Sequence, residues 1–213
     1  MASSTNHQTP LAFMKKIYVF DFDGTLTTRD TLLQFILYVW GRRTFCVGLL
    51  CYSPLLVLMK LGVYPNWKAK QKVFAHFFKG MTLEKFNDWG RRFAESAHHL
   101  LREKGLEMLR QAQAEGSEVV IVSASIDNWV QPFFTGQSGI PEVKVLGTQV
   151  EVENGRLTGR FLTKNCYGQE KVNRMLVLYP NRSEYKLIAF GDSRGDKEML
   201  AFADEAYYKP FRV

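Results

Sequence analysis

The feature that most constrains this chain is a short apolar run, residues 17–20, that leads directly into the sequence Asp-Phe-Asp-Gly-Thr at residues 21–25. Four apolar residues bounded by a turn are typical of a buried strand, and Gly24 favours a turn directly after it. In open α/β sheets, ligands bind outside the carboxyl ends of the strands. The sequence therefore predicts that Asp21 and Asp23 face a cleft, in an arrangement suited to phosphoryl transfer.

Three later segments place further polar residues in comparable positions. The apolar run 119–122 ends in Ser123, Lys171 lies in Gly-Gln-Glu-Lys-Val, and the run 187–190 leads into Gly-Asp-Ser-Arg-Gly-Asp, which contains Asp192 and Asp196. Each has an ordinary explanation by itself, because Asp is a common turn residue, Ser a common helix N-cap and Lys a common solvated helix residue. These explanations treat the four segments as unrelated. They give no reason why all four should follow one another in a single chain.

In that order the segments resemble the four motifs of the haloacid-dehalogenase superfamily of hydrolases. The resemblance implies that Asp21 is a nucleophile and Asp23 a general acid/base. It also implies that the Ser123 hydroxyl and its neighbouring backbone N–H hold a phosphate, and that Lys171 neutralises nucleophile and phosphate. A predicted hairpin at residues 150–159, together with residues 165–171 that follow it, resembles the corresponding part of the phosphoserine-phosphatase-like subfamily.

The family chemistry also implies a magnesium ion. A phosphomonoester carries nearly two negative charges, so a carboxylate can attack it only if cations offset the repulsion. Mg²⁺ prefers oxygen ligands, and the expected ones are the Asp21 carboxylate, the Asp23 backbone carbonyl and the Asp192 carboxylate. Asp196 is expected outside this shell, where it orients Lys171 or a metal-bound water. Dehalogenases do not use a second aspartate at the position of Asp23, so the resemblance favours phosphate over halide.

The expected fold class is α/β, with a Rossmann-like parallel sheet as core and an inserted all-helical cap. Asn154 and Gly155 with alternating flanks predict a hairpin with a type I′ turn. The predicted strands lie near residues 17–21, 118–123, 143–146, 187–191 and 205–208.

The length of 213 residues fits one core with one accessory domain. Asp30, Asn66 and Thr82 are predicted N-caps of cap helices, which should end near Gly41, Gly80 and Arg102. The expected division is a disordered lead-in at 1–13, a catalytic core at 14–29 and 111–213, and a helical cap at 30–110. A cap that closes over the site excludes water and carries the residues that select the substrate.

The charge is unevenly distributed. Residues 30–110 hold 13 of the 28 Lys and Arg but 6 of the 21 Asp and Glu, so the whole net charge of +7 lies in the cap. Within it, residues 45–59 are uncharged and largely apolar. One interpretation is a buried helix pair broken at Pro54, with the lysines on a solvated face. The other is a membrane-surface cap with Trp40, Tyr64 and Trp67 as flanking anchors.

Two further interpretations of the basic cap are disfavoured. The apolar run is shorter than the roughly 20 residues that span a bilayer and contains Ser-Pro, so no transmembrane helix is predicted. Basic residues interleaved with aromatics could follow a nucleic-acid backbone, but no recognition motif accompanies them. The three cysteines, Cys46, Cys51 and Cys166, form no C-x-x-C pair and are expected to be reduced thiols in a cytoplasmic protein.

The sequence thus predicts an Mg²⁺-dependent phosphatase that hydrolyses a small anionic metabolite phosphate through an aspartyl-phosphate. An alternative is a peripheral enzyme at the inner face of a membrane, acting on a lipid phosphate such as phosphatidylglycerophosphate, because some members of the subfamily resemble phosphatidylglycerophosphate phosphatases. A third hypothesis is a catalytically silent protein that holds a phosphorylated ligand. It is disfavoured because a binding module has no need for both Asp21 and Asp23.

Overall fold

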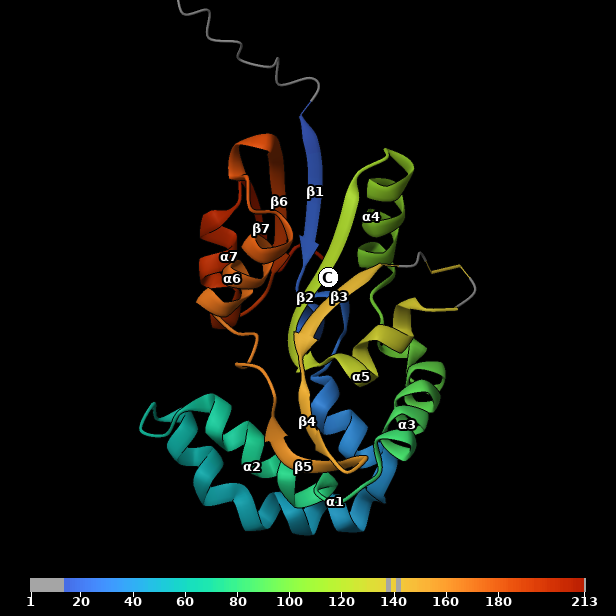
Figure 1. The fold of residues 1–213 in the computed structure, drawn as a ribbon, viewed down its shortest axis with the longest axis vertical. Coiled ribbons are helices and arrows are strands. Elements are labelled where there is room, and N and C mark those ends of the chain that lie inside the picture. Colours follow the sequence, from blue (N-terminus) through green and yellow to red (C-terminus); the bar gives the residue numbers. More distant parts are fainter. Residues whose placement is uncertain (1–13, 137–138, 141–142, 213) are drawn as a thin grey trace, which may run out of the picture.

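The computed structural model describes residues 14–136, 139–140 and 143–212. Its centre is a five-stranded parallel sheet with the strand order β3-β2-β1-β6-β7 (Figure 1). The strands lie where the sequence predicts them, which confirms the α/β class with a parallel sheet. The predicted lead-in, residues 1–13, lies outside the described residues. The strand bounds are β1 Lys15–Phe20, β2 Glu118–Ile126, β3 Lys144–Thr148, β6 Tyr185–Gly191 and β7 Glu205–Tyr208.

Both faces of the sheet are covered, as an apolar parallel strand requires. In β1, Tyr18 and Phe20 pack with the cluster that includes α4, whereas Ile17 and Val19 pack with the cluster that includes α6 and α7. In the described part of the chain the helices are α1 Thr31–Lys60, α2 Asn66–Phe78, α3 Leu83–Ser96, α4 Glu103–Ala114, α5 Asp127–Val130, α6 Gln169–Leu178 and α7 Lys197–Phe202.

Helices α1, α2 and α3 form a cap on the side toward which β1 points, in the lower half of Figure 1. The predicted cap range, residues 30–110, includes α4, which packs against β2 of the sheet. Its buried residues Leu106 and Leu109 belong to the core cluster on that face. The chain therefore returns to the core before Glu103.

The predicted helix starts are right in two of three cases. Asp30 accepts a hydrogen bond from Leu33 N at 3.2 Å, and Thr82 accepts one from Lys85 N at 3.3 Å. Asn66 does not cap α2, because Pro65 occupies the cap position and Asn66 is the first helical residue. Helix α3 ends at Ser96, well before the expected position near Arg102. After the helix the chain returns to the core, where Arg102 N donates to Leu26 O at 2.8 Å.

Pro54 does not break α1, contrary to the expectation of a broken helix pair. The one residue inside α1 with non-helical backbone angles is Gly41, with φ of 73°. Pro54 has no N–H to offer the carbonyl of Leu50, four residues earlier. The Ser53 hydroxyl donates to Leu50 O at 2.8 Å instead, so that carbonyl keeps a partner and the helix continues to Lys60.

The predicted hairpin is formed by β4 Val150–Glu153 and β5 Arg156–Phe161. Asn154 and Gly155 both have positive φ, as a type I′ turn requires. Although this segment was expected in the core, the hairpin packs against α2, and Gly80 N donates to Leu157 O at 2.8 Å. The hairpin therefore belongs to the chain after the cap but lies against a cap helix.

Among the described helices, α1 is the one whose length and apolar composition would suffice to cross a membrane. Its inner side packs against α2 and α3. The approach is close, because a Cβ at Gly48 would lie 2.3 Å from the ring carbon Cζ of Phe77. The structure thus holds α1 in the cap.

Candidate active site

The polar residues predicted from the sequence meet where the strand order reverses. From β1 the chain builds outward to β2 and β3, and then crosses to β6 on the other side of β1. Ligands bind at such switch points. Asp21 follows β1 and Asp192 follows β6, and Asp21 N donates to Phe190 O at 2.9 Å, which keeps the two strand ends side by side.

Lys171 connects the acidic groups. It lies in the first turn of α6 and is buried, with Nζ at 2.6 Å from Asp21 Oδ1 and 2.6 Å from Asp196 Oδ1. Burial lowers the pKa of Lys171, but the charges of Asp21 and Asp196 outweigh it, so the pKa lies above its usual range. A buried ammonium of this kind is tolerated because both carboxylates pair with it.

Asp21 is buried, and burial raises its pKa to about 7, while the charge of Lys171 opposes the rise. Its second oxygen, Oδ2, accepts a hydrogen bond from Thr25 Oγ1 at 3.1 Å. An additional nearby cation would favour the ionised carboxylate. The environment of Asp21 therefore suits a carboxylate that acts with a cation bound.

Asp196 organises the loop rather than facing a ligand. Its Oδ2 accepts hydrogen bonds from Asp192 N at 3.1 Å, Ser193 N at 2.9 Å and Ser193 Oγ at 2.9 Å. Burial raises the pKa of Asp196, but Lys171 and these N–H groups outweigh it and hold the pKa below its usual range. With Oδ1 on Lys171, both oxygens of Asp196 are engaged in positioning neighbours.

The donor set fits a divalent cation. Carboxylate oxygens of Asp21, Asp192 and Asp196 lie within 4.8 Å of one another. Among the described residues, Asp192 Oδ1 is buried without a hydrogen-bond partner, which is costly unless a ligand occupies it. Gly24 leaves room for the Asp192 carboxylate beside the turn after β1, because a Cβ there would lie 2.4 Å from Asp192 Oδ2. Because both oxygens of Asp196 are engaged, Asp21 and Asp192 remain as carboxylate ligands, and one or two carboxylates are what Mg²⁺ usually takes from a protein.

Arg212 is a neighbour of this set that sequence reasoning missed. Its guanidinium pairs with Asp192 Oδ2. Burial raises the pKa of Asp192, the charge of Arg212 opposes the rise, and Asp196 adds to it. No pattern near the end of the sequence indicates this contact, because it depends on where the chain passes after β7.

Asp23 belongs to a separate hydrogen-bond network. Its Oδ1 accepts from Thr31 N at 2.7 Å and Thr31 Oγ1 at 2.6 Å, and its Oδ2 accepts from Ser125 Oγ at 2.5 Å. Trp129 Nε1 in turn donates to Thr31 Oγ1 at 3.1 Å. Sequence reasoning found neither Thr31 nor Ser125. Thr31 follows the helix cap Asp30 directly, which was the one available signal that an N–H donor would lie there.

Ser123 lies beside these residues, in β2, where the pairing with β3 shifts between Val122 and Ile126. It is buried, and its hydroxyl accepts a hydrogen bond from Ser125 N at 3.0 Å. This contact shapes the segment that also carries the partner of Asp23. Phosphate binding by Ser123 stays a prediction.

Lys70 is a cap residue that reaches the site, whereas both interpretations of the sequence placed the lysines of the cap on a solvated or membrane-facing side. Its Nζ donates to Ala124 O at 2.6 Å. Burial lowers the pKa of Lys70, and the nearby charges of Asp30 and Asp23 oppose the change. The available signal was the helical spacing, because Lys70 lies one turn before the buried Phe74.

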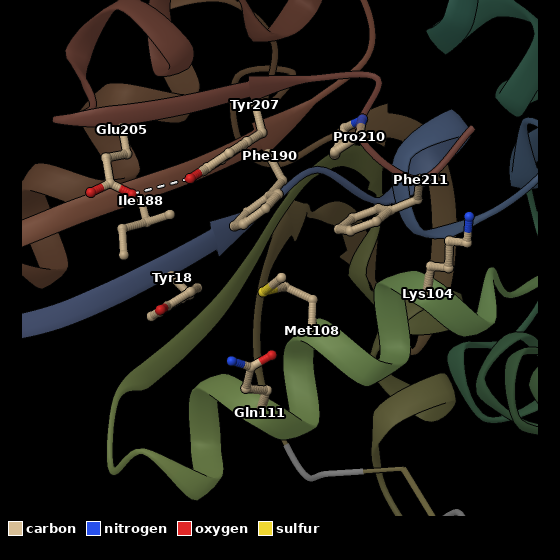
Figure 2. A pocket seen from close by; sticks show the side chains of 10 residues that line it. All are labelled: Tyr18, Lys104, Met108, Gln111, Ile188, Phe190, Glu205, Tyr207, Pro210 and Phe211. Carbon is tan, nitrogen blue, oxygen red and sulfur yellow. Dashed lines mark hydrogen bonds between the residues drawn. The ribbon is translucent and has the colours of Figure 1, made fainter. Parts of the chain in front are cut away.

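A cavity of about 410 Å³ lies elsewhere, between the sheet and α4, where Tyr18, Phe190, Tyr207, Met108 and Phe211 line it (Figure 2). None of the four aspartates described above lines this cavity. The carboxylates at the strand ends therefore lie apart from this cavity, which Lys104, Gln111 and Glu205 also line.

Comparisons with known proteins agree with this geometry. The family model described as haloacid dehalogenase-like hydrolase matches residues 18–201. Protein CicA from Caulobacter vibrioides is 36% identical over 201 residues, which cover 92% of this chain and 86% of CicA.

Solved structures of similar fold include a protein with unknown function from Bordetella pertussis Tohama I, with a TM-score of 0.74 at 19% identity over 88% of this chain and 86% of that chain. A phosphoserine phosphohydrolase-like protein from Francisella tularensis has a TM-score of 0.64 at 18% identity over 92% of this chain and 86% of that chain. At these identities the likeness is one of fold. The family match spans every aspartate of the site, and the chain therefore belongs to the haloacid dehalogenase-like hydrolases.

Proposed function

We propose that this hydrolase is a phosphatase that cleaves a phosphomonoester through a covalent intermediate on Asp21. The observation that carries the proposal is the different setting of two carboxylates two residues apart. Asp21 pairs with Lys171, whereas Asp23 is held by Thr31 and Ser125. Two carboxylates in separate environments suit two separate roles. A protein that only binds a phosphorylated ligand needs no such division.

In the first step an oxygen of Asp21 attacks phosphorus, and the bond from phosphorus to the ester oxygen breaks. The departing alkoxide takes a proton from Asp23. In the second step Asp23 takes a proton from water, the water oxygen attacks phosphorus, and the bond to Asp21 breaks. The balance is one ester and one water to one alcohol and one inorganic phosphate.

The remaining residues reduce charge repulsion during both steps. Mg²⁺, held by Asp21 and Asp192 with the Asp23 backbone carbonyl, would supply positive charge against the phosphate oxygens. Lys171 adds a fixed charge on Asp21, and Asp196 holds Lys171 in place from the other side. Thr31 and Ser125 orient Asp23 toward the leaving group.

For the substrate we propose a small metabolite phosphate that bears further negative charge. The support is Lys70, which brings a cation from the cap to the backbone between Ser123 and Ser125. A second candidate is the same reaction on a lipid phosphate, which the exposed apolar side of α1 favours.

Replacement of Asp21 tests the reaction. Asp21→Asn nearly preserves shape but removes the attacking carboxylate, so phosphate release should fall about a thousandfold or more. The matched control is Asp88→Asn, because Asp88 lies on the surface of α3 and pairs only with Arg91 and Arg92 among the ion pairs described. The measurement is phosphate release from p-nitrophenyl phosphate and a panel of phosphomonoesters, with and without Mg²⁺.

Two further measurements, thermal unfolding and the addition of beryllofluoride, make the result decisive. Thermal unfolding should show that Asp21→Asn protein remains folded. Beryllofluoride, which mimics an aspartyl-phosphate, should add to Asp21 in the presence of Mg²⁺ and fail to add to the Asn variant. Phosphate release by pure, folded Asp21→Asn protein at the rate of the unaltered enzyme would exclude the mechanism.

A further inference from the structure

The outer side of α1 is apolar and exposed. After Gly41, the positions that point away from the cap are hydrophobic, with exposed fractions of 63% at Val47, 74% at Leu50, 55% at Val57 and 42% at Leu58. These residues share one side of the helix, because they recur at helical spacing. Nothing in the described part of the chain covers them.

The inner side of the same segment is apolar as well. Phe45, Tyr52 and Leu56 pack against the core cluster, and Gly48 lies against Phe77. A helix that is hydrophobic all round is typically buried on all sides. One side of α1 packs against the other cap helices, and the opposite side meets solvent. An exposed apolar side of this kind is typical of an interaction surface.

The charge around this surface identifies the partner. Residues 31–83 contain no Asp or Glu. Exposed cations flank the apolar side at Arg42 and Arg43 before it, at Lys60 after it, and at Lys68 on the neighbouring α2. A two-fold contact between copies of this chain would set these cations against one another, because such an interface pairs one patch with itself. A partner that complements this surface must offer negative charge around an apolar region.

Tryptophans add a second signal. Trp40 and Trp67 are 40% and 46% exposed, near the kink of α1 and at the start of α2. Lys68 lies over the Trp67 ring with Nζ 5.4 Å from its centroid. Tryptophan is enriched where a protein meets the headgroup region of a membrane.

We propose that the outer side of α1 over residues 42–60 docks on an anionic lipid bilayer with the helix lying in the plane of the interface. The uncharged segment 45–59 has 15 residues and a length of about 22 Å, less than the ~30 Å hydrocarbon core. Figure 1 shows α1 along the edge of the molecule farthest from the start of β1, so docking leaves the sheet clear of the membrane.

The test is cosedimentation of the full-length protein with phosphatidylcholine vesicles, with and without phosphatidylglycerol. Anionic vesicles should bind the protein more than tenfold more tightly at low salt, and added salt should weaken that binding by screening. Replacing Arg42 and Arg43 with Gln should cost about fivefold in affinity for each charge, the equivalent of roughly 1 kcal/mol per residue. The matched control is Lys144→Gln with Lys164→Gln, two exposed lysines of the core.

A second pair of variants isolates the apolar contribution. Leu50→Gln with Val57→Gln should lower vesicle affinity more than tenfold. The matched control is Leu162→Gln with Val177→Gln, which removes two exposed apolar side chains outside α1. These exposed substitutions should leave the thermal unfolding temperature unchanged, so loss of binding is not loss of fold.

Each other outcome overturns the proposal. Equal binding to neutral and anionic vesicles removes its electrostatic basis. Resistance to extraction with alkaline carbonate indicates a membrane span, and a dimer that dissociates in the Leu50 and Val57 variant assigns the surface to a second copy. Vesicle binding does not require turnover, so it can fail or succeed independently of the proposed phosphatase activity.

Discussion

Lys70 brings a cation from the cap to the core, and we propose that it takes part in substrate choice. Its Nζ reaches the Ala124 carbonyl in the core, close to the carboxylates of Asp23 and Asp30. An ammonium in this place can bind a second anionic group of a phosphorylated substrate. Lys68, two residues earlier, instead lies exposed over the Trp67 ring. Lys70 therefore lies at the candidate site, whereas Lys68 lies on the surface.

We predict that Lys70→Met lowers kcat/KM for phosphate esters that bear a further carboxylate or phosphate by about tenfold to a hundredfold, because a hydrogen bond to a charged group contributes roughly 1.5–3 kcal/mol. The loss should fall mainly on KM. For p-nitrophenyl phosphate, which lacks the second anion, the loss should be much smaller. Lys68→Met is the matched control. An equal loss on both classes of ester would show that Lys70 only supports the fold.

At the scale of elements, close backbone contacts position the cap against the core. Gly90 in α3 faces α5, and a Cβ at Gly90 would lie 2.4 Å from the carbonyl oxygen of Asn128. Helix α5 also carries Trp129, whose ring stacks on Phe35 of α1 with centroids 4.9 Å apart. The contact of α3 with α5 thus supports the same Trp129 that holds Thr31 next to Asp23.

We predict that Gly90→Ala destabilises the protein. Helix propensity alone would favour Ala by about 1 kcal/mol. Overpacking costs about 1–3 kcal/mol, and a backbone carbonyl cannot swing away as a side chain can. An approach of 2.4 Å to backbone places the cost in the upper part of that range, so the free energy of unfolding, measured with urea, should fall by about 1–2 kcal/mol. Glu95→Ala, an exposed change in the same helix, should stay within about 0.5 kcal/mol. A gain in stability from Gly90→Ala would mean that α3 and α5 are not in close contact.

At the scale of the whole molecule, the site is assembled from both layers. The core supplies Asp21, Lys171 and Asp192, while the cap supplies Thr31 and Lys70. Contacts between cap and core hold Asp23 in place, since Thr31 begins the first cap helix and Ser125 belongs to β2 of the core. The proposed metal ligands Asp21 and Asp192 both lie on the core side of this division.

We predict that Mg²⁺ raises the thermal unfolding temperature. A ligand at a hundred times its dissociation constant stabilises the folded state by about 2.7 kcal/mol, which in a chain of this size corresponds to a shift of several degrees. Asp192→Asn should remove most of the shift, and high Mg²⁺ should restore part of it. The surface variant Asp88→Asn should keep it. A full shift in Asp192→Asn protein would place the metal elsewhere.

Local chemistry decided much of the fold and the grouping of the site. Apolar runs that end in Asp21 and Asp192 predicted strands whose ends meet, because carboxyl ends of parallel strands share one edge. Asn154 with Gly155 predicted the hairpin, and the caps Asp30 and Thr82 predicted helix starts, since each depends on residues close in sequence. The asymmetric charge of the cap was likewise readable without coordinates.

Only the tertiary structure decided which side of a helix is covered and what reaches across layers. Lys70 was indistinguishable from Lys68 by residue type, and their separation depends on the packing of α2 against the core. Thr31 and Ser125 meet at Asp23 although 94 residues separate them. Pro54 continues a helix because Ser53 serves the carbonyl that it frees. Burial and long-range contacts are properties of the packed chain, and no local pattern contains them.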